Sequence, residues 1–388
     1  MVHPYRPSGS AADLAATAAT IARDIALPNA AEVDAQGRYP IETLKALADG
    51  GFHGLCLQKD LGGRGEGMRA FACVVEELAG GCASSAMIYV MHVSAAQAIA
   101  SSKTFAARGA VLKEIAAGRH LTTLAFSESG SRSQFWAPVS RMEEKDGHFV
   151  TSATKSWVTS ANHADSYVSS AQKPGAAAPT ESTVYFLPAG TPGVRVTSSF
   201  NGLGLRGNDS APVAIEKTAV PRGDLMTAHG EGLAMMLNVV LPWFVVGTSA
   251  MSNGLCRAAV ARTAEHLKGT GFEHTGTALR DLPGLRARLA EMNVRTEAAR
   301  ALLGHTLDHL EQPGEATPLF VLQSRLAALQ AADTVTDLAM KACGGAAFSR
   351  HLGVERIFRD ARAGWVMAPT VDHLHEFVGR ALTGLPLL

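Results

Sequence analysis

The sequence lacks three features that would assign it to a specialised class of protein. Its 35 Lys and Arg residues are balanced by 35 Asp and Glu residues, so no net charge favours nucleic acid or an anionic membrane as a partner. Its five cysteines are scattered, odd in number and without a C-x-x-C pair, which argues against a disulfide framework and against a zinc site. The first ten residues, MVHPYRPSGS, have neither the basic start nor the apolar core of a signal peptide. We therefore expect a cytoplasmic protein without a metal, whose partner is a small molecule.

Two long runs without a charged residue are present, at 81–102 and 232–256. Each is long enough to cross a membrane. The first, however, consists mainly of Ala, Ser and Gly with His92 inside it, and the second is interrupted by Asn238 and Pro242. We interpret both runs as helices that are buried on all sides in a bundle, and we expect no contact with a membrane.

The apolar periodicity along the 388 residues predicts three domains. Residues 1–121 have the spacing of successive helices. Residues 122–228 change to short alternating runs bounded by turn residues, which is typical of strands. Residues 229–388 return to the helical pattern, with long helices near 232–268, 284–311 and 317–342. The fold class is therefore α+β, with a middle β domain between two helical domains.

Local signals refine this prediction at one helix and one turn. Ser10 with Asp13 three residues later predicts a helix start, and Pro28 predicts the end of that helix. Asp146-Gly147 lies between two strand-like runs and predicts a tight hairpin.

The glycines of GLGLRG at 202–207 form the pattern G-x-G-x-x-G, which binds dinucleotides where a strand turns into a helix. Here the letters NDSAP follow, and they lead into a strand-like run. We therefore interpret this segment as a tight connection between strands.

Several segments, taken in order, resemble the acyl-CoA dehydrogenase superfamily. LAFSESGSRS is similar to the family's T-E-P-x-x-G-S-D loop, shortened by two residues, and TKSWVTSA is similar to its G-x-K-x-W-I-T-N-A strand. GLGLRGNDS, AVP and HGEGLAMML resemble its next three motifs, and MKACGGAAFSRHLGVERIFRDAR resembles its Q-x-x-G-G-x-G-Y and P-V-E-R-x-Y-R-D-A-R segments. This resemblance spans nearly the whole chain. It implies an N-terminal helical domain, a middle β-barrel domain, a C-terminal four-helix bundle and FAD as the cofactor.

The resemblance also implies roles for particular residues. Trp157 is expected against the isoalloxazine ring, Thr159 near its N5 atom, and Gly130 and Ser131 at phosphates. The full set expected at the cofactor is Phe126, Ser127, Gly130, Ser131, Trp157, Val158, Thr159, Gly344, Gly345 and Thr370. Ser131, Trp243 and Phe244 are expected at the substrate, which the resemblance implies is a CoA thioester or a similarly activated molecule. The two glycines at 344–345 correspond to a pair that approaches the FAD of a neighbouring subunit, so a homodimer or homotetramer is implied.

The sequence departs from the family at the catalytic base. Most members carry a glutamate in Y-E-G-T after R-D-A-R, but Ala368 stands there, and the alternative position used by some relatives falls in the apolar run 241–247. A positioned general base is worth typically 10²- to 10⁴-fold in rate, so ordinary dehydrogenation is not expected. His92 and His373 are the candidates for an assisting residue.

Three readings remain open. The first is an FAD-dependent oxygenase or oxidase that needs no glutamate, and the second is a dehydrogenase whose base has moved elsewhere. The third is a subunit that binds flavin or CoA without chemistry of its own. The electron partner is either a flavin reductase or an electron-transfer flavoprotein.

Overall fold

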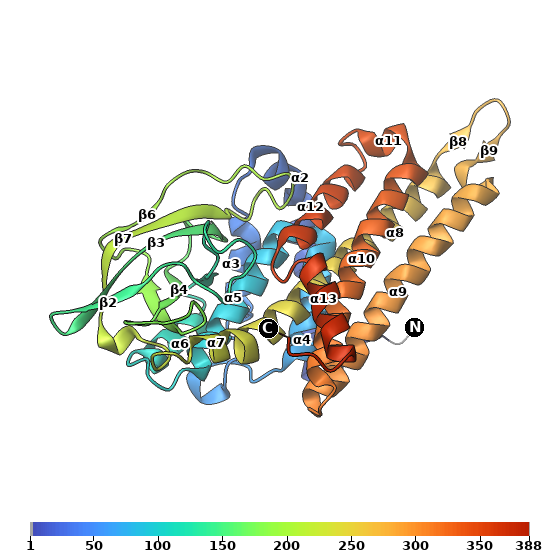
Figure 1. Cartoon of the computed structure of the whole chain (residues 1–388). Helices are drawn as coiled ribbons and strands as arrows, with labels where there is room; N and C mark the ends of the chain where they lie inside the picture. Colours follow the sequence, from blue (N-terminus) through green and yellow to red (C-terminus); the bar gives the residue numbers. More distant parts are fainter. Residues whose placement is uncertain (1–2, 388) are drawn as a thin grey trace.

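Helices form both ends of the chain and strands form its middle (Figure 1), in a computed structural model that describes residues 3–387. The change from helix to strand occurs at β1, close to the position expected from the periodicity. The N-terminal helices are α1 (Ser10–Ile21), α2 (Leu27–Gln36), α3 (Ile41–Asp49), α4 (Met68–Gly81), α5 (Ala83–Ser101) and α6 (Arg108–Ala116).

The first helix does not start or stop as the local signals predict. Gly9 is the N-cap, and the hydroxyl of Ser10 donates to Glu66 at 2.6 Å, so the expected capping by Ser10 is wrong. Pro28 does not end the helical run, because the wide π-helical turn Ala22–Ala26 precedes it and α2 then begins just before the proline. Pro28 lacks the N–H that a continuing helix would use, and the π-helical turn before it is an irregularity that accommodates this loss without ending the run.

The strands of the middle domain form two separate sheets. One has the order β1-β4-β5 and the other has the order β2-β3-β7-β6. The strands are β1 (Thr122–Ala125), β2 (Met142–Lys145), β3 (His148–Val158), β4 (Ser166–Gln172), β5 (Ser182–Pro188), β6 (Val194–Val196) and β7 (Ala211–Val220). The Asp146-Gly147 hairpin is confirmed, since it joins β2 to β3 with positive φ at both residues.

The expected closed barrel is not formed by the strands of residues 3–387. The edge strands β1 and β6 have only four and three residues, which is too short to close a ladder. Single bridges link the sheets instead, one between Arg141 and Gln172 and one between Glu128 and Lys155. A shared apolar core that includes Phe149 fills the space between them.

Three long helices lie side by side in the C-terminal domain (Figure 1). The shorter α12 packs against two of them, α8 and α10. The elements are α7 (Gly232–Met235), α8 (Leu241–Gly269), β8 (Gly271–Phe272), β9 (Thr277–Ala278), α9 (Pro283–Glu311), α10 (Thr317–Cys343), α11 (Gly345–Phe348), α12 (Val354–Val366) and α13 (Val371–Leu382). A second π-helical turn, Met236–Val240, joins α7 to α8 just before Pro242.

The two uncharged runs differ in their burial. Both helices, α5 and the continuous helix Gly232–Gly269, are long and apolar enough to cross a membrane. The most apolar stretch of α5 is 89% buried, as expected for a core helix, but that of the second helix is only 50% buried. The expectation of complete burial is therefore wrong for the second run: Ala234 and Asn238 are exposed at the surface, and Leu241 and Phe244 face the cavity described below.

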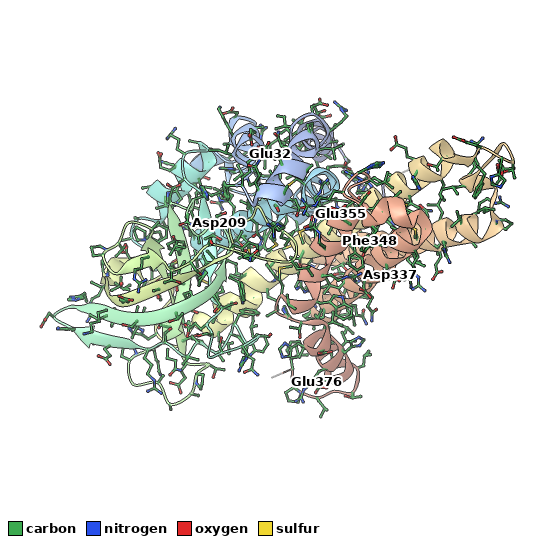
Figure 2. The ribbon with its side chains drawn as sticks, turned by 90° about the horizontal axis from the view of Figure 1, so that it is seen from above. Glu32, Asp209, Asp337, Phe348, Glu355 and Glu376 are labelled. Atoms are coloured by element: carbon green, nitrogen blue, oxygen red, sulfur yellow. The ribbon has the colours of Figure 1, made fainter. Side chains whose placement is uncertain are left out.

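The glycine-rich segment 202–207 connects β6 to β7, so it is not a dinucleotide-binding turn. Its glycines allow close contact with both helical domains. A Cβ atom on Gly204 would lie 2.4 Å from the carbonyl oxygen of Arg359 in α12, and one on Gly207 would lie 2.2 Å from the side chain of Val33 in α2. In the view from above, Asp209 lies where this segment meets the N-terminal helices, whereas Phe348 lies on the C-terminal helices (Figure 2).

Candidate functional site

A cavity of about 790 Å³ lies where the three domains meet. Its walls come from α5, the end of β1, the end of β3, the segment 200–210, α8 and the end of α12. Apolar side chains form most of these walls, among them Met87, Met91, Leu124, Phe135, Phe244 and Val366. The volume is within the range of small-molecule and cofactor sites.

The structure brings several of the sequence-predicted residues to this cavity. Phe126, Ser127, Trp157, Thr159 and Phe244 line it, and so does Ala368. The residues come from segments more than 200 positions apart in the sequence. Their convergence is what a single ligand site requires, although each role inferred from the resemblance stays a prediction.

Other predicted residues lie beside the cavity or away from it. The Ser131 hydroxyl shares hydrogen bonds with the backbone of Glu128, and Gly130 packs against Val139. Val158 is buried in its sheet, and Thr370 caps α13. Trp243 turns away from the cavity and packs against Phe71, with 5.6 Å between ring centroids.

The glycines at 344–345 lie at the end of α10, outside the cavity of their own chain. Phe348 follows them and is 86% exposed. Within the described chain these two glycines therefore contact no ligand site. The resemblance implies that they approach the FAD of a neighbouring subunit instead.

Trp157 has an unusual backbone conformation at the rim of the cavity. Its φ angle is +56°, in the region that side-chain-bearing residues rarely adopt, and the pairing of β3 with β7 is irregular between Lys155 and Val158. This irregularity places the indole on the cavity side, where it is 69% exposed. The next residue in the cavity wall, Thr159, shares a hydrogen bond of 3.1 Å with Ser210.

A buried ion pair fixes the turn that follows β1. Lys155 donates from Nζ to Oε1 of Glu128 and to the carbonyl oxygen of Ser170, both at 2.7 Å. Glu128 also accepts from the backbone N–H groups of Val139 and Ser140 and from the Ser140 hydroxyl. Burial would raise the pKa of Glu128, but Lys155 and these donors outweigh that effect and hold the pKa below its ordinary value.

Glu128 is the only acidic residue that lines the cavity within the described chain. Both of its carboxylate oxygens are occupied by the donors named above, so it has no free position from which to take a proton from a ligand. The site therefore offers a carboxylate with a structural role and no free carboxylate base.

Neither of the two candidate histidines lines the cavity. His92 is buried in α5, where Nδ1 accepts from the Thr122 backbone at 3.2 Å and Nε2 lies 3.3 Å from the carbonyl oxygen of His53. Burial lowers the pKa of His92 well below its ordinary value, so the ring is neutral. His373 lies in α13 beside Trp136, and its buried Nδ1 has no hydrogen-bond partner in the described chain.

One residue near the site was missed by sequence reasoning. Arg325 of α10 is fully buried behind Phe244 and Met367, two residues of the cavity wall. The sequence does contain a signal for this residue. Arg325 falls on the same helical face as Val321 and Ala328, and a charged residue is unusual on a face whose spacing predicts burial.

Comparison with known proteins gives a consistent result across the whole chain. Residues 10–119 match the acyl-CoA dehydrogenase N-terminal domain, residues 123–218 its middle domain and residues 230–382 its C-terminal domain. An acryloyl-CoA reductase (NADH) from Anaerotignum propionicum is 26% identical over 90% of this chain and 88% of its own length.

Solved structures of other proteins have the same fold as this chain. The butyryl-CoA dehydrogenase of Megasphaera elsdenii superposes with a TM-score of 0.91 at 22% identity, over 97% of this chain and 99% of that one. An FAD complex of PigA superposes with a TM-score of 0.89 at 20% identity, over 97% and 98% of the two chains.

Proposed function

The chain belongs to the acyl-CoA dehydrogenase family, and we propose that it is an FAD-dependent oxidoreductase that passes electrons to O₂ without using a glutamate base. The substrate proposed is a CoA thioester or a similarly activated molecule. The names of the relatives support this class, since they include an acryloyl-CoA reductase and a butyryl-CoA dehydrogenase.

FAD is the cofactor, and the residues of the cavity fit it. An isoalloxazine ring needs an apolar or aromatic wall together with hydrogen-bonding groups at its polar edge. Trp157 and Phe126 offer the wall, and the hydroxyls of Ser127, Thr159 and Ser210 offer the polar groups. When bound, FAD supplies the electron acceptor that no side chain of the protein can provide.

The absence of a free carboxylate in the cavity is the observation that supports a mechanism other than ordinary dehydrogenation. Ala368 carries a methyl group at the wall where the family usually has glutamate, and Glu128 is fully engaged by its donors. A base worth typically 10²- to 10⁴-fold is therefore missing from the described cavity wall. An enzyme whose flavin is reduced by a separate flavin reductase and then reacts with O₂ takes no α-proton from its substrate to reduce the flavin, so it does not depend on that base.

Two experiments on the purified FAD-loaded protein test the proposal. First, butyryl-CoA is added without oxygen and the flavin absorbance is followed; we expect no bleaching, and rapid bleaching would instead support a dehydrogenase with a relocated base. Second, oxygen uptake is measured after an NADH-fed flavin reductase is added, and we expect uptake above that of the reductase alone.

The substitution Ala368→Glu sharpens the first experiment, with Ala368→Gln as a control of the same size. We expect the glutamate variant to gain bleaching by butyryl-CoA and the glutamine variant to gain none. A protein that stays colourless with added FAD would contradict the proposed function and leave the non-catalytic subunit as the alternative.

The assembly and location of the protein are also proposals. We propose a homodimer or homotetramer, because the exposed Phe348 and the glycines at 344–345 lie at an end of the C-terminal domain where a second subunit would cover them. A cytoplasmic location is proposed separately. A flavin reductase is the proposed electron donor, and an electron-transfer flavoprotein would replace it under the dehydrogenase alternative. Sedimentation of the FAD-loaded protein measures the number of subunits.

A further inference from the structure

Arg325 is a buried cation without a counter-anion. None of its side chain is exposed, and Nη2 donates to the carbonyl oxygen of Met367 at 3.0 Å while Nε donates to that of Pro369 at 3.3 Å. Nη1 donates to the hydroxyl of Thr248. These contacts use three of the five N–H groups of the guanidinium, and all three acceptors are uncharged.

Within residues 3–387, no Asp or Glu carboxylate pairs with Arg325. Burial lowers its pKa to about 9, so the group is still charged at neutral pH. A buried ion that lacks a partner is costly, because its lost hydration is not replaced by an opposite charge. A negatively charged ligand bound in the cavity would supply this partner.

The charge lies directly behind the cavity. The Cζ atom of Arg325 is 5.1 Å from the ring centroid of Phe244, and both Phe244 and Met367 line the cavity. The two backbone carbonyls that accept from Arg325 belong to the residues on either side of Ala368. Arg325 therefore holds the segment of the wall where the family usually has its base. No carboxylate from that wall neutralises it.

The other charges of the cavity do not supply the missing anion. Glu128 is neutralised by Lys155. Arg359 and Arg362 at the cavity each have an acidic partner, Asp34 and Asp333 respectively, and Arg132 adds a further positive charge. No acidic side chain of the described cavity wall is therefore left to balance the charge of Arg325.

We propose that the cavity binds a substrate whose reacting part carries a carboxylate, and that Arg325 is the positioning residue that supplies the compensating charge behind the wall at Ala368. This inference rests on the proposed function and specifies its substrate class. The apolar side chains named above would contact the body of the substrate, and the carboxylate would lie against the wall formed by Phe244, Met367 and Ala368. Electrostatic complementarity of this kind excludes an uncharged analogue of the same shape.

Benzoate and benzamide provide a matched pair of probes, since they have nearly the same shape and differ in charge. Their dissociation constants are measured by titration calorimetry at pH 7, once with the FAD-loaded protein and once with the protein freed of flavin. We expect benzoate to bind more tightly than benzamide by roughly tenfold or more in the FAD-loaded protein. Equal affinities would overturn the proposal.

Substitutions at position 368 test the source of the preference without altering Arg325. Ala368→Glu places a carboxylate on the wall that Arg325 holds, so we expect the preference for benzoate to be lost. Ala368→Gln has the same size without the charge, and we expect it to keep the preference. If both variants lose it equally, the preference depends on space at the wall and the proposal is wrong.

Substitutions of Arg325 complete the test. Arg325→Lys is expected to keep the preference for benzoate and Arg325→Met to abolish it, with thermal unfolding measured for each to verify that it folds. Arg295→Met is the matched control on the exposed surface of α9 and is expected to bind both probes as the unaltered protein does. If Arg325→Met does not fold, the pair at position 368 still decides the question.

The inference and the proposed function can fail separately. If FAD binds and benzoate shows no advantage, the inference is wrong and the function stands. If FAD does not bind, the function is wrong, and the calorimetry on the flavin-free protein still reports whether the cavity prefers the anion.

Discussion

The ammonium group of Lys155 lies 2.7 Å from a carboxylate oxygen of Glu128, and both side chains are buried at the junction of the two sheets. This pair fastens β3 to the turn that carries Ser127. Since Lys155 is two residues before Trp157, the same contact fixes the strand that presents the indole to the cavity.

Removing one member of this pair is expected to be strongly destabilising. Lys155→Met leaves the Glu128 carboxylate buried without its cation, which typically costs about 3–5 kcal/mol in the free energy of unfolding. Urea denaturation measures this loss. The double variant Lys155→Met with Glu128→Leu is the control, and we expect it to be more stable than Lys155→Met alone because no unpaired charge remains.

Trp157 allows the role of the ring to be separated from the strain of its backbone. Trp157→Ala and Trp157→Gly both remove the indole, so we expect both to weaken FAD binding to the same extent. At a φ of +56°, however, glycine is unstrained and alanine is not, so the glycine variant should be more stable by about 1 kcal/mol. Fluorimetric FAD titration and thermal unfolding give the two quantities, and a glycine variant less stable than the alanine variant would contradict the assignment of strain.

His92 is expected to serve stability and not catalysis. His92→Phe leaves the backbone N–H of Thr122 without an acceptor, which costs about 1–3 kcal/mol. His92→Asn retains an acceptor at a similar position and should cost less. Oxygen uptake per bound flavin is expected to stay unchanged in both variants, and a large loss of turnover with FAD still bound would support a catalytic role for this histidine.

Asp360 predicts a specific dependence of stability on pH. Burial raises its pKa from the ordinary value of 3.8 to about 7, partly opposed by the hydrogen bond from the Leu205 backbone. Because the folded state favours the protonated form, this stabilisation is complete below pH 4 and is lost as the pH rises towards 7. Each pKa unit corresponds to about 1.4 kcal/mol, so the loss is at most about 4 kcal/mol.

The substitution Asp360→Asn isolates this effect, since the amide oxygen can still accept from Leu205 but cannot ionise. We expect the difference in free energy of unfolding between Asp360→Asn and the unaltered protein to shift in favour of the variant as the pH rises from 4 to 8. Asp337→Asn, at a half-buried residue of α10 that is labelled in Figure 2, is the control and should show no such trend. Parallel pH profiles for Asp360→Asn and the unaltered protein would refute the prediction.

The sequence was sufficient for features that depend on local pattern. The order of domains follows from the change of apolar period near residue 121, and the hairpin at Asp146-Gly147 follows from the need for positive φ at both turn residues. The family resemblance led to the prediction that Phe126, Trp157 and Phe244 share one ligand site, and all three line the same cavity. Periodicity could not make this prediction, because it carries no information on contacts between distant segments.

Features that depend on tertiary contacts were not predictable in the same way. Whether the sheets close depends on the lengths of β1 and β6, and propensity does not fix strand ends. The helix continues through Pro28 because a π-helical turn absorbs the irregularity before it. Similarly, the partners of His92 are backbone groups of distant segments, so its sequence neighbourhood could not exclude a catalytic role.

The close approach of Gly204 to α12 restricts how a ligand can enter. A side chain of any size at position 204 would force the backbone of Arg359 and Asp360 away, so the middle domain and α12 are in direct backbone contact at this point. Hinging these two parts of the molecule apart would break that contact and the hydrogen bond from Leu205 to Asp360. Exchange of a small ligand is therefore expected to take place through the opening beside the exposed Trp157 and Leu203, with the domains staying together.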